Sequence, residues 1–275
     1  MRITFEDNRI EVTSNHHLEM KDGVVFTYKK LEESSLVIKG NKLDMRLSIP
    51  MKIEEVYLSG KQQFNLVVED DLEISSVILV QNDADINKKV TLNNNDNYIQ
   101  VVADLFGVKG TLKETINIEG ENSYCYSKAA CVTRNKGKNM DIEAVHNAPK
   151  SASKLDNYGV VLGDGNLVFN ITGSIAKKCV KSDVKQNNRI ILFDKESTGS
   201  IEPMLYIDEN DVAASHAAAV GKVDDNHIFY LCSRGLDEKK AKIEIAKGYI
   251  APVLEYVKDE DIKNKIEKEL EVEVF

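Results

Sequence analysis

The sequence predicts a mainly β protein with a helical C-terminal part, and three observations support this class. Short runs rich in Val, Ile, Leu, Tyr and Phe follow one another at a spacing of roughly 10–12 residues. Asn, Asp, Gly and charged residues fill the gaps between these runs, as they do in turns. Helical periodicity is missing until about Ala214. A series of short strands with this spacing is typical of a sandwich, a barrel or a solenoid.

The expected strands run through the first three quarters of the chain. The clearest ones cover residues 24–28, 35–40, 45–50, 55–60, 64–70, 76–81, 98–103 and 115–120. Further strands follow in CYSKAACV, DIEAVHNAP, YGVVLGDG, LVFNITGSIA, RIILFD and PMLYIDE. LNNNDN (92–97) and KQNNR (185–189) resemble tight corners, because Asn tolerates the left-handed conformation. No motif repeats clearly, so the period alone does not establish a solenoid.

The C-terminal part is predicted to be helical. Asp224 and Asp225 are N-cap candidates for a short helix that Gly235 ends. A longer amphipathic helix is expected over residues 236–257, with an N-cap at Asp237. Its apolar face includes Ile243, Ala246 and Ile250, and Pro252 should kink it. A last helix is expected over residues 259–270.

Composition excludes several classes of function. Among 275 residues, 36 are Lys or Arg and 45 are Asp or Glu, a formal charge of -9 that argues against a nucleic-acid binder. No apolar run reaches the roughly 18 residues of a membrane helix, and the acidic start MRITFEDNRIEV is unlike a signal peptide. These features predict a cytoplasmic protein that binds no membrane. The four cysteines are widely spaced and form no CxxC pair, which argues against disulfides and a zinc site.

A resemblance to a known family is carried by PMLYIDENDVAASHAAAVGKVDDNHIFYLCSRGLDEKKAKIEIAKGYI, residues 203–250. This run resembles the C-terminal signature of the SufB/SufD family, the non-ATPase subunits of the SUF iron–sulfur cluster assembly complex. Residues 145–175, with the motif HNAP, and residues 185–194 resemble two further segments of that family. The resemblance covers about half of the chain, whereas roughly the first 110 residues match no known pattern.

The resemblance implies a fold and a set of partners. It implies a right-handed parallel β-helix with a small α-helical subdomain at its C-terminal end. The chain would then divide into a β-rich N-terminal part (1–110), the family core of the β-helix (111–221) and the helical subdomain (222–275). The family implies a SufC-type ABC ATPase as one partner. We expect this ATPase to contact the helix face that includes Ile243, Ala246 and Ile250. It also implies a second subunit, either SufB-like or another copy of this chain, and a scaffold rather than an enzyme.

The resemblance also implies a site for a transient iron–sulfur cluster at His216, with no stably bound cofactor. Neutral imidazole is a common metal ligand, although a histidine at a strand edge can also simply bond a carbonyl group. Two positions depart from SufB-type chains: Asn188 stands where they have a cysteine, and Ala217 where they have a glutamate. The chain is SufD-like in this respect. Cys232 is the first substitute ligand to consider, and Cys179 the second.

The departures leave two functions open. The first is a SufD-like scaffold subunit of a cluster assembly complex. The alternative is a β-helical structural or binding protein of the same family that has lost its cluster chemistry. The absent cysteine at Asn188 and the absent glutamate at Ala217 favour the alternative, whereas His216 and its family context favour the scaffold.

Overall fold

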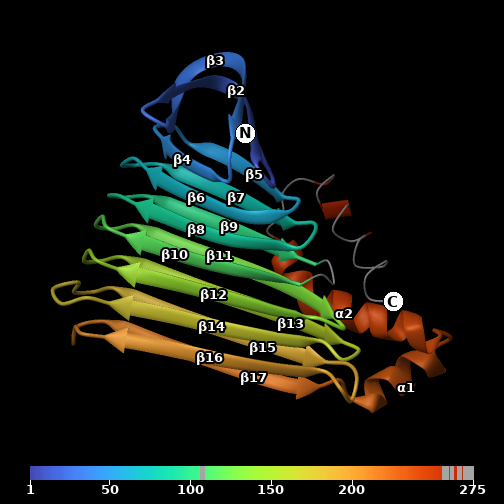
Figure 1. Cartoon of the computed structure of the whole chain (residues 1–275). Helices are drawn as coiled ribbons and strands as arrows, with labels where there is room; N and C mark the ends of the chain where they lie inside the picture. The colour runs from blue at the N-terminus through green and yellow to red at the C-terminus, as the bar shows by residue number, and fades with distance from the viewer. Residues whose placement is uncertain (106–108, 256–259, 261–262, 265–267, 269–275) are drawn as a thin grey trace.

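The fold is a flattened β-solenoid in which successive strands alternate between two parallel sheets (Figure 1). The structure is a computed structural model that describes all residues except 106–108, 256–259, 261–262, 265–267 and 269–275. The prediction of a mainly β solenoid with a small helical end is confirmed.

The two sheets contain the strands of alternating number. The even-numbered sheet, which faces the viewer in Figure 1, consists of β4 (Lys42–Leu47), β6 (Gly60–Val68), β8 (Ala84–Leu92), β10 (Gly110–Ile118), β12 (Gly137–His146), β14 (Asn166–Ile175) and β16 (Thr198–Ile207). The odd-numbered sheet behind it consists of β1 (Arg2–Glu6), β5 (Met51–Tyr57), β7 (Glu73–Val80), β9 (Asn97–Asp104), β11 (Tyr124–Arg134), β13 (Ala152–Leu162), β15 (Asp183–Leu192) and β17 (Ala213–Lys222).

The length of one solenoid turn grows along the chain. Lys42 on β4 pairs with Gln63 on β6, a step of 21 residues. Asn166 on β14 pairs with Thr198 on β16, a step of 32 residues. This change explains why no repeat is visible in the sequence, since a drifting period shifts every position out of alignment with its equivalent in the next turn.

One corner of the solenoid is built in the same way turn after turn. At this corner, left-handed backbone recurs at Asp71, Asn95, Asn122, Lys150 and Lys181. The amide of Asn95, for example, donates to the carbonyl of Glu121 in the next turn at 2.9 Å. The prediction of a corner at residues 92–97 is therefore confirmed. The prediction for residues 185–189 is wrong, because this segment lies inside β15 and its Asn188 is buried.

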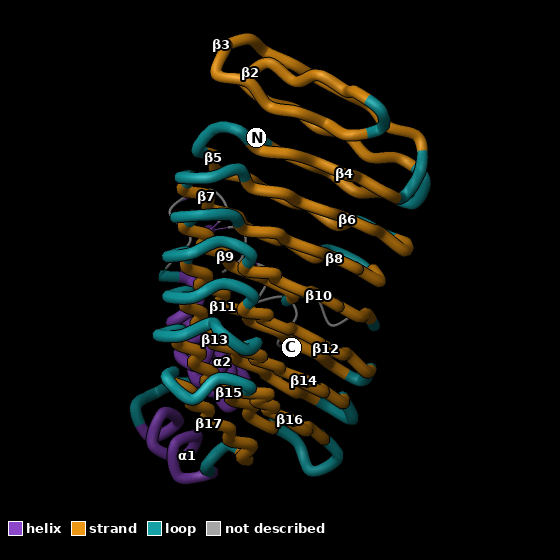
Figure 2. Tube along the Cα trace, turned by 90° about the vertical axis from the view of Figure 1, so that its left-hand side faces the viewer, coloured by secondary structure: helices purple, strands orange, loops and turns teal. Residues whose placement is uncertain are grey.

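A hairpin that the sequence did not predict as such covers the N-terminal end of the solenoid. It consists of β2 (Arg9–Lys21) and β3 (Val24–Lys39), which pair antiparallel with two register shifts between Ser14 and Leu18. β1 also pairs antiparallel with β2, whereas it joins β5 in parallel. The hairpin arches over the first turn (Figure 2), so this end of the sheets is closed by the chain itself.

Two helices follow at the C-terminal end, of which the second packs behind the odd-numbered sheet and the first contacts the second. α1 (Asp225–Ser233) and α2 (Glu238–Leu254) begin at the predicted N-caps, Asp224 and Asp237, whose side chains accept backbone N–H bonds. Lys128 on β11 donates to the carbonyl of Pro252 near the end of α2 at 2.8 Å. The helix expected over residues 259–270 lies mostly outside the described residues. Within the described part of the chain, no helix is long and apolar enough to cross a membrane.

An ion pair network lies between the sheets, in the otherwise apolar core. Lys88 Nζ on β8 donates to Glu55 Oε1 at 2.6 Å and lies 3.8 Å from Glu114 Oε1. It also donates to Tyr98 and Gln100 of the odd-numbered sheet, and all five side chains are buried. Burial alone would lower the pKa of Lys88, but the charges of Glu55 and its neighbours raise it, so the ammonium stays charged.

Candidate functional site

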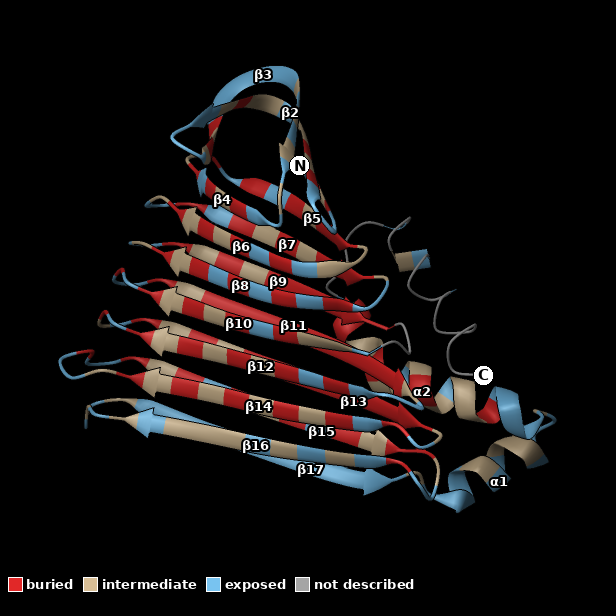
Figure 3. Ribbon diagram, in the orientation of Figure 1, coloured by how far each residue is buried: buried red, intermediate tan, exposed pale blue. Residues whose placement is uncertain are grey.

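The last turn of the solenoid is uncovered. Every residue of β17 is exposed, in contrast to the alternating burial of β15 beside it (Figure 3). β16 pairs with β14 and β17 with β15, and no described strand pairs with their other edges. An edge of this kind offers unpaired N–H and C=O groups to a further chain. The open C-terminal end therefore differs from the N-terminal end, which the hairpin covers.

His216 lies in the middle of this open edge strand. It stands in register with Gln186 of β15, whose side chain is 4% exposed and belongs to the inward-facing row of that strand. His216 therefore occupies an inward-facing position at the open end of the solenoid, where no described residues form a further turn over it. Its ring has no hydrogen-bond or ion-pair partner among the residues that the structure describes, so it is not a histidine satisfied by a local carbonyl group.

The position expected for a cysteine is filled by a buried amide. Asn188 faces inward on β15, opposite Ala218 of β17, and is fully buried. Its Oδ1 accepts a 2.8 Å hydrogen bond from Asn157 Nδ2 on β13. Its Nδ2 has no partner among the described residues. Ala217 lies on the opposite, outward-facing row of β17, so neither position supplies a ligand beside His216.

The cysteines do not complete a metal site with the other residues that the structure describes. Cys232 lies on α1 and is partly exposed, whereas Cys125, Cys131 and Cys179 are buried. Burial raises the pKa of each of these three thiols, which keeps them protonated. Cys179 lies in the turn between β14 and β15. No three His, Cys, Asp or Glu side chains among the described residues are placed to hold one metal ion.

The apolar face predicted for the longer helix exists, and in the structure it packs on the odd-numbered sheet. Ala246 and Ile250 are fully buried, and Ile243 is partly buried, in a cluster with the outward-facing side chains of the odd-numbered sheet. A partner could contact Ala246 or Ile250 only if α2 left the sheet. An amphipathic pattern shows that a helix covers something and does not show what it covers, so the ATPase contact expected at these residues stays a prediction.

Exposed aromatic residues on the shorter helix are a surface that sequence reasoning missed. No residue of α1 is buried, and Phe229 is 74% exposed. Tyr230 beside it, Tyr206 on β16 and Val220 on β17 are exposed as well. The adjacent pair Phe229 and Tyr230 was an available signal, because neighbouring residues on a helix point in directions about 100° apart. Large exposed apolar groups gathered at one end indicate an interaction surface.

His146, from the HNAP motif, has a structural position. It ends β12, is fully buried, and its ring nitrogens lie 2.8 Å from Ser151 Oγ and 2.8 Å from Ser153 Oγ. Burial lowers its pKa to about 4, so the ring is neutral. Both ring nitrogens are occupied by hydroxyl groups, which supports a role in the turn rather than in metal binding.

Together these features define a class of protein: a parallel β-solenoid with a C-terminal helix pair and a histidine on its uncovered last strand. A family model described as "SUF system FeS cluster assembly, SufBD core domain" matches residues 60–249, more than half of the chain. The chain therefore belongs to the SufBD core family, as the resemblance predicted.

Curated relatives point to the SufD branch of this family. The iron-sulfur cluster assembly protein SufD of Bacillus subtilis is 29% identical over 191 residues, which are 69% of this chain and 44% of the relative. SufD of Escherichia coli is 31% identical over 150 residues, 54% of this chain and 36% of the relative. The chain thus matches less than half the length of either protein.

Proposed function

We propose that this chain is a SufD-like scaffold subunit of an iron–sulfur cluster assembly complex, and not an enzyme in its own right. The observation that carries the proposal is His216 on an uncovered strand, at the end where the solenoid lacks a cover. A second subunit, SufB-like or another copy, would pair with this edge and enclose the histidine. Family membership and the SufD relatives support the assembly role. We further propose that the protein acts in the cytoplasm.

The chemistry of the site requires ligands from a second chain. Nascent clusters bind through soft thiolates, and imidazole can take one iron position. This chain offers the imidazole of His216, while its three buried cysteines are protonated and Asn188 occupies the expected thiolate position. A SufB-like partner would supply the thiolate. In a pair of identical chains, Cys232 is the accessible thiol of this chain and would have to serve.

Anaerobic reconstitution tests the cluster role. The purified chain, alone and mixed with a SufB-like partner, would be incubated with ferrous iron and sulfide and followed by visible absorption. Absorption that appears with the partner and weakens in His216→Ala supports the proposal. Gln186→Ala is the matched control, since Gln186 is the neighbour of His216 in the ladder but is not a metal ligand. Equal absorption with and without His216 would contradict the assignment.

A SufC-type ATPase is the second proposed partner, and we place its contact on the exposed side of the helical subdomain. Phe229 and Tyr230 are large and exposed, and substituting them leaves the packing of α2 on the sheet in place. Phe229→Asp/Tyr230→Asp should abolish co-purification with the ATPase and preserve the β-sheet circular dichroism. The control pair Lys239→Ala/Lys240→Ala changes exposed residues of α2. Co-purification that survives the aromatic substitutions would refute this contact.

Loss of cluster chemistry is the alternative function, and one observation favours it. Asn188, at the position expected for a cysteine ligand, is buried and accepts a hydrogen bond from Asn157, so it contributes to the core and not to a ligand set. A protein that stays colourless in every reconstitution, but still forms a stable complex through its open end, would have this alternative function.

A further inference from the structure

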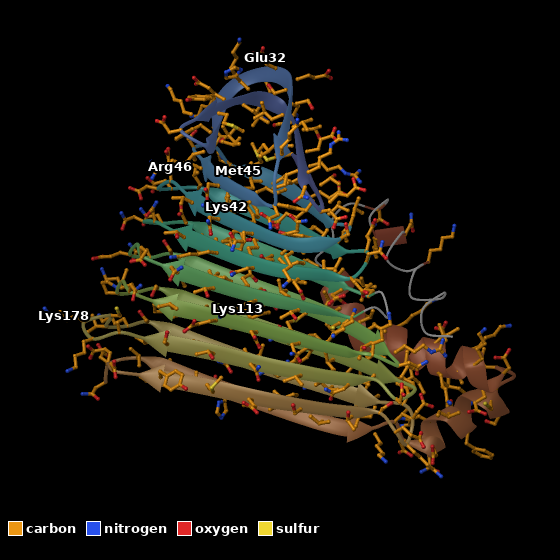
Figure 4. The ribbon with its side chains drawn as sticks, viewed as in Figure 1. Glu32, Lys42, Met45, Arg46, Lys113 and Lys178 are labelled. Carbon is orange, nitrogen blue, oxygen red and sulfur yellow. The ribbon has the colours of Figure 1, made fainter. Side chains whose placement is uncertain are left out.

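The outward face of the even-numbered sheet is open and divided by charge. Over its first four strands, β4 to β10, the outward-facing cations are Lys42, Arg46, Lys61, Lys89 and Lys113. The acidic residues on the same part of the face are Asp44 and Asp85. Over β12 to β16 the charged residues of the face are Asp141, Glu143 and Glu202. Figure 4 shows Lys42, Arg46 and Lys113 on this face, which is turned to the viewer.

The cationic half of this face is unexpected in a chain with a formal charge of -9. Charges of one sign over a limited surface raise the local concentration of ions of the opposite sign. Lys42 is partly neutralised by Asp44 at 2.8 Å, and Arg46 lies 4.0 Å from Glu69. Lys61 and Lys113 have no ion-pair partner within the described part of the chain, so both ammonium groups are available to bind an anion.

These two lysines stand at opposite corners of a regular grid of side chains. The parallel register places Lys61 and Gln63 of β6 beside Asp85 and Asn87 of β8, and these beside Thr111 and Lys113 of β10. Neighbouring strands are about 4.8 Å apart, so the flexible lysine side chains can lean toward the central row from both sides. The grid lines a shallow groove of about 440 Å³, to which Asn41 also contributes.

Hydrogen-bond donors dominate the groove. Two ammonium groups, the amides of Gln63 and Asn87 and the hydroxyl of Thr111 point to a ligand rich in acceptor oxygens. None of these side chains has a hydrogen-bond partner among the described residues, in contrast to Asn65 on the same sheet, which donates to Asp44 at 2.6 Å. Asp85 in the central row is the one acceptor among the charged groups, and it favours a ligand that also carries a donor.

From this arrangement we propose a binding site for a small oxyanion, a phosphate or carboxylate group on a small polar molecule, in the groove between Lys61 and Lys113. Charge-assisted hydrogen bonds from the two lysines hold the anion, and the amides of Gln63 and Asn87 orient it. The volume of the groove suits a small molecule. The site lies on the outward face of the even-numbered sheet, away from His216, and does not depend on the proposed cluster chemistry.

Equilibrium dialysis of the full chain with labelled orthophosphate tests the site, at a fixed ionic strength that screens general attraction. Lys61→Ala/Lys113→Ala should weaken binding about tenfold or more, since each lysine contributes a charge-assisted hydrogen bond. The matched control is Lys42→Ala/Lys89→Ala, which removes the same charge from the same face outside the grid. Asp85→Asn should tighten phosphate binding because it removes a repulsive charge.

Three results would overturn the proposal: no phosphate bound at millimolar concentration, an equal loss in the two double variants, or weaker binding in Asp85→Asn. Equal losses would mean that the general field of the face attracts the anion without a site. Competition by unlabelled succinate distinguishes the two sources of oxyanion. Displacement shows that the groove accepts carboxylates as well, and retention of the label shows that it selects phosphate.

Discussion

Asn157 donates a 2.8 Å hydrogen bond to Asn188 across two neighbouring turns of the solenoid, and both side chains are fully buried. Asn157 Oδ1 and Asn188 Nδ2 have no partner among the described residues. Asn188 stands in register with Ala218 on the open edge strand. This relationship ties the position that departs from SufB-type chains to the stability of the core.

Asn188→Ala should destabilise the protein, because it leaves the amide of Asn157 buried without a partner. We expect a loss of about 1–3 kcal/mol in the free energy of unfolding, measured in urea. The double variant Asn157→Leu/Asn188→Leu should recover most of this loss, since replacing both polar partners removes the unpaired groups. A double variant less stable than Asn188→Ala would show that the amides have another role.

Lys88→Met should be far more destabilising than Lys89→Met, although the two residues are adjacent. Lys88 is buried between Glu55 and Glu114, and its removal leaves carboxylates without a counter-ion, at a cost of about 3–5 kcal/mol. Lys89 is exposed and has no ion-pair partner among the described residues, so its substitution should leave the urea midpoint unchanged. Similar midpoints for the two variants would mean that the network is not closed to water.

His146 should make the protein less stable in mild acid. Burial lowers its pKa to about 4 from an ordinary value of 6.5, so the unfolded chain binds the proton more tightly than the folded one. The stabilising contribution is therefore complete above about pH 6.5 and is lost as the pH falls toward 4, by about 3 kcal/mol in total. His146→Gln should show a flatter dependence of unfolding free energy on pH over this window. An unchanged slope would contradict the buried neutral ring.

Thiol labelling should distinguish Cys232 from the other cysteines. In the folded protein a thiol reagent should modify Cys232 rapidly, while Cys125, Cys131 and Cys179 react only after unfolding, since burial raises their pKa. Cys232→Ser should then remove the fast phase. Full denaturation should release all four thiols of the wild-type chain. A fast phase that persists in Cys232→Ser would show that a turn of the solenoid opens readily.

Much of the architecture was predictable from local patterns, and the failures have physical causes. Strand spacing and Asn corners such as 92–97 reflect backbone preferences, which act locally and are visible in sequence. The segment 185–189 was misread because a buried Asn ladder has the same composition as a corner. The hairpin of β2 and β3 escaped prediction although its two-residue turn, Asp22 and Gly23, has the Asp-Gly sequence and the positive φ angles typical of a tight hairpin.

The candidate site was predictable only in part. The family resemblance predicted a ligand at His216 and the loss of one at Asn188. The structure adds that His216 is exposed without a partner among the described residues and that Asn188 is buried in the core. The role of Ala246 and Ile250 could not be deduced, because an apolar helix face packs equally well on its own sheet and on another protein. The grid between Lys61 and Lys113 arises only when the register of three strands is known.

We expect the hairpin at the N-terminal end to limit how far such chains associate. A solenoid with unpaired strands at both ends can add further copies indefinitely, as fibres do. A solenoid with unpaired strands at one end has no free edge left after it pairs with one other chain. Here the arch of β2 and β3 occupies one end, and β16 and β17 leave the other free. We therefore expect association through the open end to stop at two chains, because the antiparallel arch at the other end, far from the histidine, leaves no second edge to pair.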